Sequence, residues 1–421
     1  MGERLIANNK GIEIGNVKIP ALFFADDMAI LAQNEADMNE QLGTLITFCE
    51  ERKLEVNYKK TQIMKVRDNS KENWKIRDKD GIQELEIVDT FKYLGIQIGN
   101  NRNIYREQER SSISKLKRNV FVGITKLKAK GSFNKFEVAE ALWDYVCING
   151  TLYGAETVVY TEETIKKMEV LQNQLASWIL GANRGTAIEA LRGELGWETM
   201  RTIIYRRKLN YVNRIRELLS GSWTYKVYEN LMLNGIDTKW IKDIRKINSV
   251  LENDYNTDDL SIKSIRDWEK GVREKRSLTL YPVEWNGKRK QYLDGSKNSF
   301  AFFKTITGTL IRKYELEKCK LCGLENPDEY HVIFECQPLA IIRSDMGFEG
   351  ILQEQGLTIE ASISREIIRE HLGKLENECK KKLGGMFGKI FNVWSSGENE
   401  GRVPSGSTNA QDNAASRRPV T

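Results

Sequence analysis

The chain is 421 residues long, with 40% hydrophobic and 29% charged residues and a formal net charge of +6 at pH 7. This length allows two or three domains with apolar cores, and the small excess of positive charge does not by itself indicate a nucleic-acid partner. Neither a membrane span nor a secretory signal is predicted, because the sequence has no uncharged apolar run of about 18 residues and no apolar signal core at its N-terminus. Six cysteines in so long a chain do not make a disulfide framework, so we expect an intracellular protein.

The first predicted element is a β-hairpin that carries two adjacent carboxylates at its turn. Apolar runs from Ala21 to Ala25 and from Met28 to Ala32 flank Asp26 and Asp27. Two carboxylates at a turn can hold Mg²⁺, which prefers hard oxygen ligands. The alternative is an ordinary turn, because short acidic side chains accept hydrogen bonds from their own backbone at bends.

A helix and further strands complete residues 1–100. The stretch from Glu35 to Arg52 has apolar residues at helical spacing, and Val56 to Val66 and Ile82 to Ile98 have the character of strands. These elements predict an α+β domain. Two motifs within it are LEVNYKKT, at Leu54–Thr61, and FKYLG, at Phe91–Gly95.

Residues 101–247 show a helical pattern with two basic stretches. Apolar residues recur at the spacing of helices that pack on a core. The stretches Arg102–Lys130 and Arg201–Arg216 are rich in Lys and Arg, and tyrosines lie within the second. A basic helical face with aromatic residues can follow phosphates and stack on bases, whereas the alternative is an ordinary solvated face. The candidate nucleic-acid-binding residues are Lys115, Lys117, Arg118, Arg206, Arg207 and Lys208.

A cluster of metal-ligand type follows a less regular segment. Residues 248–299 are charged and poor in long apolar runs, so a linker or mobile segment is predicted there. The region 300–340 then contains a Cys-x2-Cys-x8-His-x4-Cys pattern, formed by Cys319, Cys322, His331 and Cys336. Two thiolates on a tight turn, with a histidine and a cysteine on a short helix after it, are typical of structural Zn²⁺.

The remaining residues predict helices and a tail. Residues 341–394 are expected to form one or two helices, and residues 395–421 are expected to be disordered because they have almost no large apolar side chains. These residues are too few for an additional endonuclease domain, and none is assigned.

The signals taken together resemble the reverse transcriptases of non-LTR retrotransposons, the LINE class. The matching features, in chain order, are the Asp26–Asp27 turn, the Leu54–Thr61 segment, the Phe91–Gly95 hairpin and the Cys/His pattern. Shorter segments that resemble the family's post-palm region are Tyr153–Glu156 and Leu191–Trp197. The resemblance spans roughly residues 11–340. It implies part of a reverse-transcriptase palm, a mainly α-helical thumb over residues 101–247 and a small zinc knuckle.

The resemblance also implies roles for particular residues. Asp26 and Asp27 would be catalytic and hold Mg²⁺, Asp26 more directly, and Lys60 would lie near the incoming triphosphate. Apart from the resemblance, Asn57 and Thr61 are expected simply to fix the local turn. The residues implied in the primer grip are Phe91, Tyr93, Leu94 and Gly95. The alternatives are an exposed surface lysine at position 60 and an ordinary half-buried strand at position 93.

The N-terminus departs from the family pattern. In the family, fingers and a palm strand with a further essential aspartate lie far upstream of the aspartate pair, but only 25 residues precede Asp26 here. Loss of a bridging carboxylate from a two-metal site is expected to cost roughly 1,000-fold or more in rate. We therefore expect the C-terminal part of an RNA-directed DNA polymerase that is inactive without an upstream half. Its expected partners are an RNA template and a DNA primer, in a nuclear or cytoplasmic ribonucleoprotein. The alternative is a non-enzymatic RNA- or DNA-binding remnant.

Overall fold

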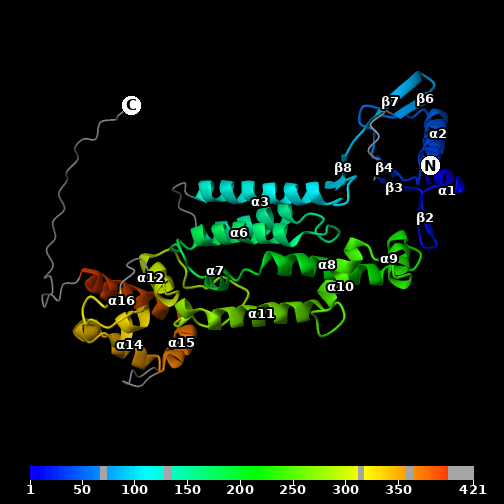
Figure 1. Ribbon diagram of the computed structural model, residues 1–421. Coiled ribbons are helices and arrows are strands. Elements are labelled where there is room, and N and C mark those ends of the chain that lie inside the picture. The colour runs from blue at the N-terminus through cyan, green and yellow to red at the C-terminus, as the bar shows by residue number, and fades with distance from the viewer. Residues whose placement is uncertain (67–73, 128–134, 312–316, 357–363, 397–421) are drawn as a thin grey trace, which may run out of the picture.

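The computed structural model describes residues 1–66, 74–127, 135–311, 317–356 and 364–396. The molecule is elongated, with a lobe of strands and helices at the N-terminal end, a body of long helices, and a group of C-terminal helices at the opposite end (Figure 1). The tail predicted over residues 395–421 lies outside the described residues from position 397 onward. No helix in the described part of the chain is both long enough and apolar enough to cross a membrane.

The N-terminal lobe mixes helices with short strands. Its elements are α1 (Gly2–Ala7), β1 (Ile12–Ile14), β2 (Val17–Ile19), β3 (Ala21–Phe24), β4 (Asp27–Ile30), α2 (Glu35–Arg52), β5 (Gln62–Ile63), β6 (Trp74–Asp78), β7 (Gly81–Ile87), β8 (Thr90–Tyr93) and β9 (Ile96–Gly99). Strands β3 and β4 pair antiparallel with Phe24 opposite Asp27, so the hairpin predicted around the two aspartates is confirmed. Ala25 turns the chain at a φ of 53°, a left-handed conformation that costs a non-glycine residue about 1–2 kcal/mol.

Helix α2 closes a small core beneath the lobe's sheet. It begins at Asn34, whose side chain accepts a hydrogen bond from the backbone N–H of Asp37, so the predicted helix is capped at its start. Buried leucines on one face of α2 lie in a cluster with Trp74 and Leu85 from the sheet β5–β7–β6. This core positions the strands that follow the hairpin.

The expected strands are only partly present. The stretch Val56–Val66 contains the two-residue strand β5, because the preceding residues form a hydrogen-bonded turn. The stretch Ile82–Ile98 is divided among β7, β8 and β9. Leu94 and Gly95 make the turn between β8 and β9 with φ values of 46° and 86°, so this motif is a tight hairpin.

Two polar contacts join the β8–β9 hairpin to the helical body. The hydroxyl of Tyr153 donates to the carbonyl oxygen of Leu94 at 3.0 Å, and the backbone N–H of Gln97 donates to the side chain of Gln108 at 3.0 Å. Any side chain on Gly95 would meet the ring of Tyr153, since an added Cβ would lie 2.9 Å from its Cε1 atom. The Tyr153–Glu156 segment is therefore the support of the hairpin turn.

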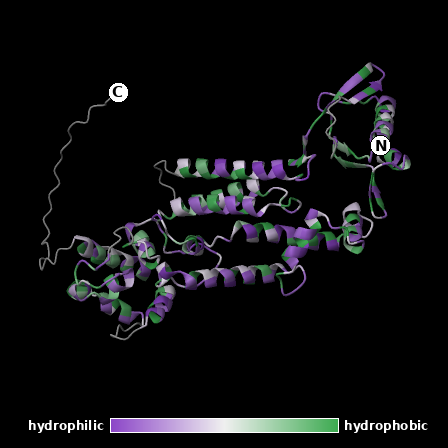
Figure 2. Cartoon of the chain, viewed as in Figure 1, coloured by the Kyte–Doolittle hydropathy of each residue, from purple (hydrophilic) through white to green (hydrophobic). Residues whose placement is uncertain are grey.

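The remainder of the described chain is helical. Its elements are α3 (Arg106–Leu127), α4 (Lys135–Ala141), the π-helix η1 (Leu142–Ile148), α5 (Asn149–Thr151), α6 (Glu162–Ile179), α7 (Ile188–Leu195), α8 (Met200–Glu217), α9 (Trp223–Leu233), α10 (Lys239–Asn248), α11 (Thr257–Glu274), η2 (Arg276–Leu278), α12 (Lys297–Ile306), the π-helix η4 (His331–Glu335), η5 (Gln337–Leu339), α13 (Ala340–Asp345), α14 (Phe348–Glu354), α15 (Arg365–Lys374) and α16 (Asn377–Ser396). One apolar cluster extends from Leu116 on α3 to Trp394 on α16. Hydrophobic and hydrophilic residues alternate along the long helices (Figure 2), as expected of amphipathic helices on a shared core. A mixed N-terminal lobe followed by a mainly helical region agrees with the fold class predicted from the sequence.

Residues 248–299 differ from the predicted linker or mobile segment. They contain the 18-residue helix α11, whose Trp268 and Val272 are buried in the main core. Tyr281 and Tyr292 further along are also buried there. The many charges in this stretch lie on the exposed side of α11, and the few apolar residues are enough to fix the other side. The prediction of a linker or mobile segment from composition was therefore wrong for residues 248–299.

Glycines let α16 approach α12 closely. Two of them lie on the same helix but differ in the space available for a side chain, so their substitution is a test of the close approach. An added Cβ at Gly384 would lie 2.1 Å from the carbonyl oxygen of Asn298, whereas one at Gly388 would lie 3.7 Å from the Cβ of Ala301. We expect Gly384→Ala to destabilise the protein by about 1–3 kcal/mol, because the backbone of α12 must move. Gly388→Ala is expected to be neutral or slightly stabilising. Thermal unfolding of both variants checks this, and equal midpoints would contradict the close approach.

Candidate functional site

The aspartate pair lies beside the β8–β9 hairpin. Both Asp26 and Asp27 are exposed at the β3–β4 turn. Burial and the negative charge of Asp27 raise the pKa of Tyr93, which places that phenol within electrostatic reach of Asp27. Phe91 is half-buried on the same strand, and Leu94 is exposed at the turn. The structure therefore brings the predicted metal ligands and the predicted primer-grip hairpin to one side of the lobe.

The third predicted element of this site is a local turn. The side chain of Asn57 accepts a hydrogen bond from the backbone N–H of Lys60 at 3.3 Å, and the hydroxyl of Thr61 donates to the carbonyl oxygen of Asn57 at 2.9 Å. Asn57 and Thr61 thus fix the turn, as expected. The side chain of Lys60 is exposed at its surface, where it can meet an anionic ligand.

The aspartate pair is not joined by a third ligand within the described residues. In that part of the chain, the Cys/His cluster is the one group of three or more His, Cys, Asp or Glu side chains that lie close enough to share a metal ion. Two exposed carboxylates can hold Mg²⁺ together with waters and substrate phosphates. A two-metal site needs a further carboxylate, which the residues described here do not supply.

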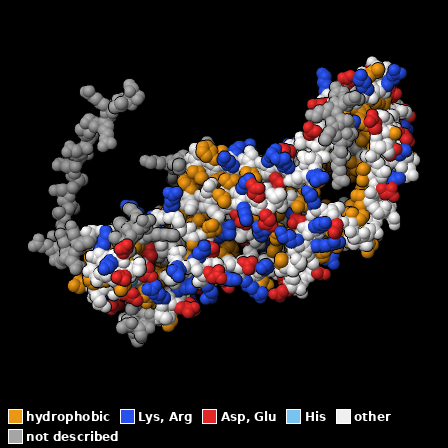
Figure 3. Space-filling model, in the orientation of Figure 1, with side chains coloured by type: hydrophobic (Ala, Val, Ile, Leu, Met, Phe, Trp, Pro, Cys, Tyr) orange, Lys and Arg blue, Asp and Glu red, His pale blue; other side chains and the backbone are white. Residues whose placement is uncertain are grey.

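Basic residues on α3 are open to a partner. Lys117 and Arg118 are exposed, and Lys115 is half-buried. Figure 3 shows Lys and Arg side chains gathered along the edge of the helical body over α3, the helix that follows the β8–β9 hairpin. Of the three predicted nucleic-acid-binding residues on α3, Lys117 and Arg118 are therefore the two that are fully open to a partner.

The three predicted residues on α8 have internal partners, and the prediction is wrong for one of them, Lys208, because it is buried. Lys208 is 1% exposed and forms an ion pair with Asp243 of α10, so it cannot contact nucleic acid. Arg206 is held by both carboxylate oxygens of Glu198. Arg207 donates to the carbonyl oxygen of Leu152 at 2.8 Å and to Asn149 at 2.9 Å. These basic residues of α8 thus hold parts of the protein together, although their charge had suggested a nucleic-acid-binding surface.

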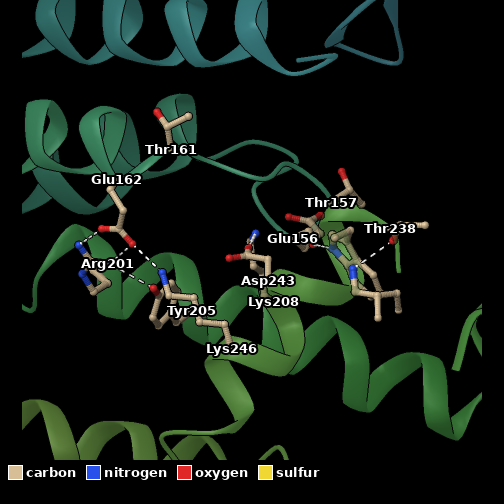
Figure 4. A network of polar contacts seen from close by, with 12 residues as sticks. Glu156, Thr157, Thr161, Glu162, Arg201, Tyr205, Lys208, Thr238, Asp243 and Lys246 are labelled. Carbon is tan, nitrogen blue, oxygen red and sulfur yellow. Dashed lines mark hydrogen bonds and ion pairs between the residues drawn. The ribbon is translucent and has the colours of Figure 1, made fainter. Parts of the chain in front are cut away.

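Basic residues of α8 also take part in a polar network between α6, α8 and α10 (Figure 4). Glu162 accepts hydrogen bonds from Arg201 and Lys246, which lower its pKa to about 2. Arg201 also donates to the hydroxyl of Tyr205 at 3.1 Å. A pocket of about 310 Å³ opens here, but its acids and bases are paired with one another. We read this network as structural.

A second, wider groove lies on the neighbouring face of α8. It has a volume of about 580 Å³, and its lining residues are Glu156, Arg207, Asn210, Tyr211, Asn213, Arg214 and Glu217. The guanidinium of Arg214 lies over the ring of Tyr211 at 5.3 Å. Its two arginines face two glutamates, so the groove has no excess of positive charge.

The Cys/His cluster forms a compact set of ligands. The possible donor atoms of Cys319, Cys322, His331 and Cys336 all lie within 4.8 Å of one another. The Sγ atoms of Cys319 and Cys336 are 3.9 Å apart, and the Sγ atom of Cys322 is 3.3 Å from Nε2 of His331. The convergence predicted from their spacing is confirmed. Gly323, at a φ of 79°, makes the turn after the second cysteine.

The cluster fits a tetrahedral metal ion. Zn–S bonds of about 2.3 Å place two sulfur ligands about 3.8 Å apart, close to the observed separation of the Cys319 and Cys336 sulfurs. Burial opposes ionisation of the Cys319 thiol, but the backbone N–H groups of Cys322 and Leu321 outweigh it and lower the pKa. The Nδ1 atom of His331 is buried and lies 3.6 Å from a carboxylate oxygen of Glu335, so Nε2 is the ring nitrogen that is turned to the cysteine sulfurs and would be the ligand atom.

Comparison with known proteins shows which family the N-terminal lobe resembles. Residues 3–98 match the family model "Reverse transcriptase (RNA-dependent DNA polymerase)". This span contains the aspartate pair, the Asn57–Thr61 turn and the β8–β9 hairpin. A protein of Caenorhabditis elegans described as uncharacterized and transposon-derived is 22% identical over 213 residues, which cover 48% of this chain and 74% of the relative. The lobe is thus reverse-transcriptase-like, and the chain is similar to a transposon-derived protein.

Sequence reasoning missed two features that support the site. The contact of Tyr153 with the hairpin turn joins residues 59 positions apart, and only its resemblance to the family's post-palm region marked this segment. The burial of Lys208 had a local signal, because it lies four residues after Ile204 and four before Val212, both buried. A lysine on an apolar stripe is better read as a buried ion-pair partner than as a surface cation.

Proposed function

We propose that this chain contributes the metal-binding hairpin of a LINE-type reverse transcriptase, which extends a DNA primer on an RNA template. The observations that carry the proposal are that Asp26 and Asp27 lie exposed at the β3–β4 turn and that Tyr93 lies within electrostatic reach of Asp27, all within the segment that matches reverse transcriptases. In this role, Asp26 and Asp27 hold Mg²⁺, which stabilises the charge that develops on the transferred phosphate. Lys60 lies near the triphosphate and favours the departure of pyrophosphate.

The β8–β9 hairpin positions the primer in this proposal. Phe91, Tyr93, Leu94 and Gly95 hold the primer end, and Tyr153 fixes their turn against the helical body. Because no third carboxylate joins the pair in the described residues, the complete two-metal site needs a segment from outside them. Unaided polymerisation is therefore not expected, and an upstream polymerase half is the proposed partner.

We further propose that the Cys/His cluster binds structural Zn²⁺. Three thiolates and one imidazole leave no open position on a tetrahedral ion, so the centre orders the chain and does no chemistry. Lys318 and Lys320, which flank Cys319 in the sequence, are exposed and can meet phosphates.

The exposed face of α3 is the proposed path of the nucleic acid as it leaves the hairpin. Replacing Lys117 and Arg118 by alanine is expected to lower the slope of log affinity against log salt by about 1.8 for a duplex, since each phosphate contact contributes about 0.9. Fluorescence anisotropy with a primer–template at several salt concentrations measures this. The matched control is Lys263→Ala with Lys270→Ala on α11, where both lysines pair with acids one turn away. Equal slopes for the two double variants would contradict the proposed path.

A second candidate function is nucleic-acid binding without catalysis, within a nuclear or cytoplasmic ribonucleoprotein. The incomplete carboxylate set favours it, because basic residues and a metal-ordered module are enough to hold RNA. Both functions predict salt-dependent binding, and neither predicts extension by the chain alone. Primer extension with an upstream polymerase segment added separates them, because only the first function then predicts extension that depends on Asp26.

A further inference from the structure

A contact between the Cys/His cluster and the last described helix is not apparent from the spacing of the ligands. The indole Nε1 atom of Trp394, on α16, lies 3.3 Å from the Sγ atom of Cys319. Trp394 is fully buried and Cys319 is 3% exposed. An indole N–H can only donate a hydrogen bond, so the sulfur is the acceptor. A thiolate accepts more strongly than a thiol, because charge strengthens the bond.

Further contacts join the same two parts of the chain. Lys320, next to Cys319, donates from Nζ to the carbonyl oxygen of Ser395 at 3.0 Å, and its ammonium lies 5.7 Å from the centre of the Trp394 ring. The ring of Phe387 on α16 lies edge-on to Phe334 of η4, the short helix that carries His331. Helix α16 therefore packs on both halves of the cluster, with its end on the Cys319 side and its middle on the His331 side.

We propose that Trp394 is a positioning residue of the metal centre, and that the bound metal thereby holds the end of α16 against the Cys319–Cys322 turn. The inference rests on the proposed Zn²⁺ site. Hydrogen bonds to ligand atoms fix their orientation, and their loss weakens metal binding. Because Trp394 follows Cys319 by 75 residues, this bond couples metal binding to the packing of a distant helix.

The first test compares zinc affinities by competition with a chromophoric chelator. Trp394→Phe keeps an aromatic ring but removes the N–H donor, and we expect it to bind zinc about 10–100-fold more weakly. The matched control is Trp268→Phe, because Trp268 is also buried and its Nε1 atom donates to the carbonyl oxygen of Glu189 at 2.8 Å, outside the cluster. That variant is expected to keep the wild-type affinity. Equal affinities for wild type and Trp394→Phe would overturn the proposal.

The second test uses the unchanged chain. Amide hydrogen exchange over residues 390–396 is measured with zinc bound and after chelation. We expect chelation to speed exchange at this end of α16, and unchanged exchange would overturn the proposal. A wild-type chain that takes up no zinc would overturn it together with the metal centre, but would leave the proposal for the aspartate hairpin standing.

Discussion

Replacing Cys336 by serine is expected to remove zinc from the protein and to unfold the region around the cluster at lower temperature. Cys336 is fully buried and is one of the four converging ligands. In small zinc modules the metal contributes about 10 kcal/mol or more of apparent binding free energy to folding. If a third of this binding free energy is lost from the free energy of unfolding, the midpoint temperature of unfolding falls by about 10 °C, because each kcal/mol corresponds to about 2–4 °C. Metal analysis and thermal unfolding measure the two effects.

The control for this prediction is Cys379→Ser. Cys379 lies on α16 and is half-buried, but it does not belong to the cluster. We expect one zinc ion per chain in wild type and in Cys379→Ser, and none in Cys336→Ser. Full zinc content in Cys336→Ser, or the same loss in the control, would show that these four side chains do not form the centre.

Replacing Asp26 by alanine is expected to abolish RNA-templated primer extension in a polypeptide that also supplies the third carboxylate. Asp26 lies exposed at the turn of the hairpin, where its carboxylate is free to bind a metal ion. Loss of a metal-bridging carboxylate removes several kcal/mol of transition-state stabilisation, so we expect the rate to fall roughly 1,000-fold or more. The measurement is extension of a labelled DNA primer on an RNA template with Mg²⁺.

Asp80→Ala provides the matched control for that experiment. Asp80 is also an exposed aspartate in the N-terminal lobe, at the turn between β6 and β7. We expect its removal to leave extension unchanged. A variant at Asp26 that extends primers as well as the Asp80 variant does would exclude Asp26 as a metal ligand.

The elements that the sequence predicted well have local signals. The hairpin around Asp26 is bounded by apolar runs, and α2 begins at an Asn cap, so short-range chemistry defines both. The spacing of the Cys/His cluster likewise reflects one turn and one short helix. These features depend on neighbours a few residues apart.

The features that the sequence did not reveal depend on distant partners. Lys208 is buried because Asp243, on another helix, pairs with it. The order of α11 comes from Trp268 and Val272 packing on a core built mostly from other helices. The contact of Trp394 with Cys319 joins residues 75 positions apart. Composition and local spacing identify the charged and apolar residues of a chain, but they do not show which of these residues contact one another in the fold.

The most direct test of the proposed role is primer extension by the purified chain, with and without an upstream reverse-transcriptase segment that carries the third carboxylate. We predict salt-dependent binding of the primer–template by the chain alone, no extension, and extension that depends on Asp26 when the segment is added. Extension by the chain alone, abolished by Asp26→Ala, would show that the site is already complete and contradict the proposed need for a partner. Absence of both binding and extension in every combination would contradict the reverse-transcriptase role itself.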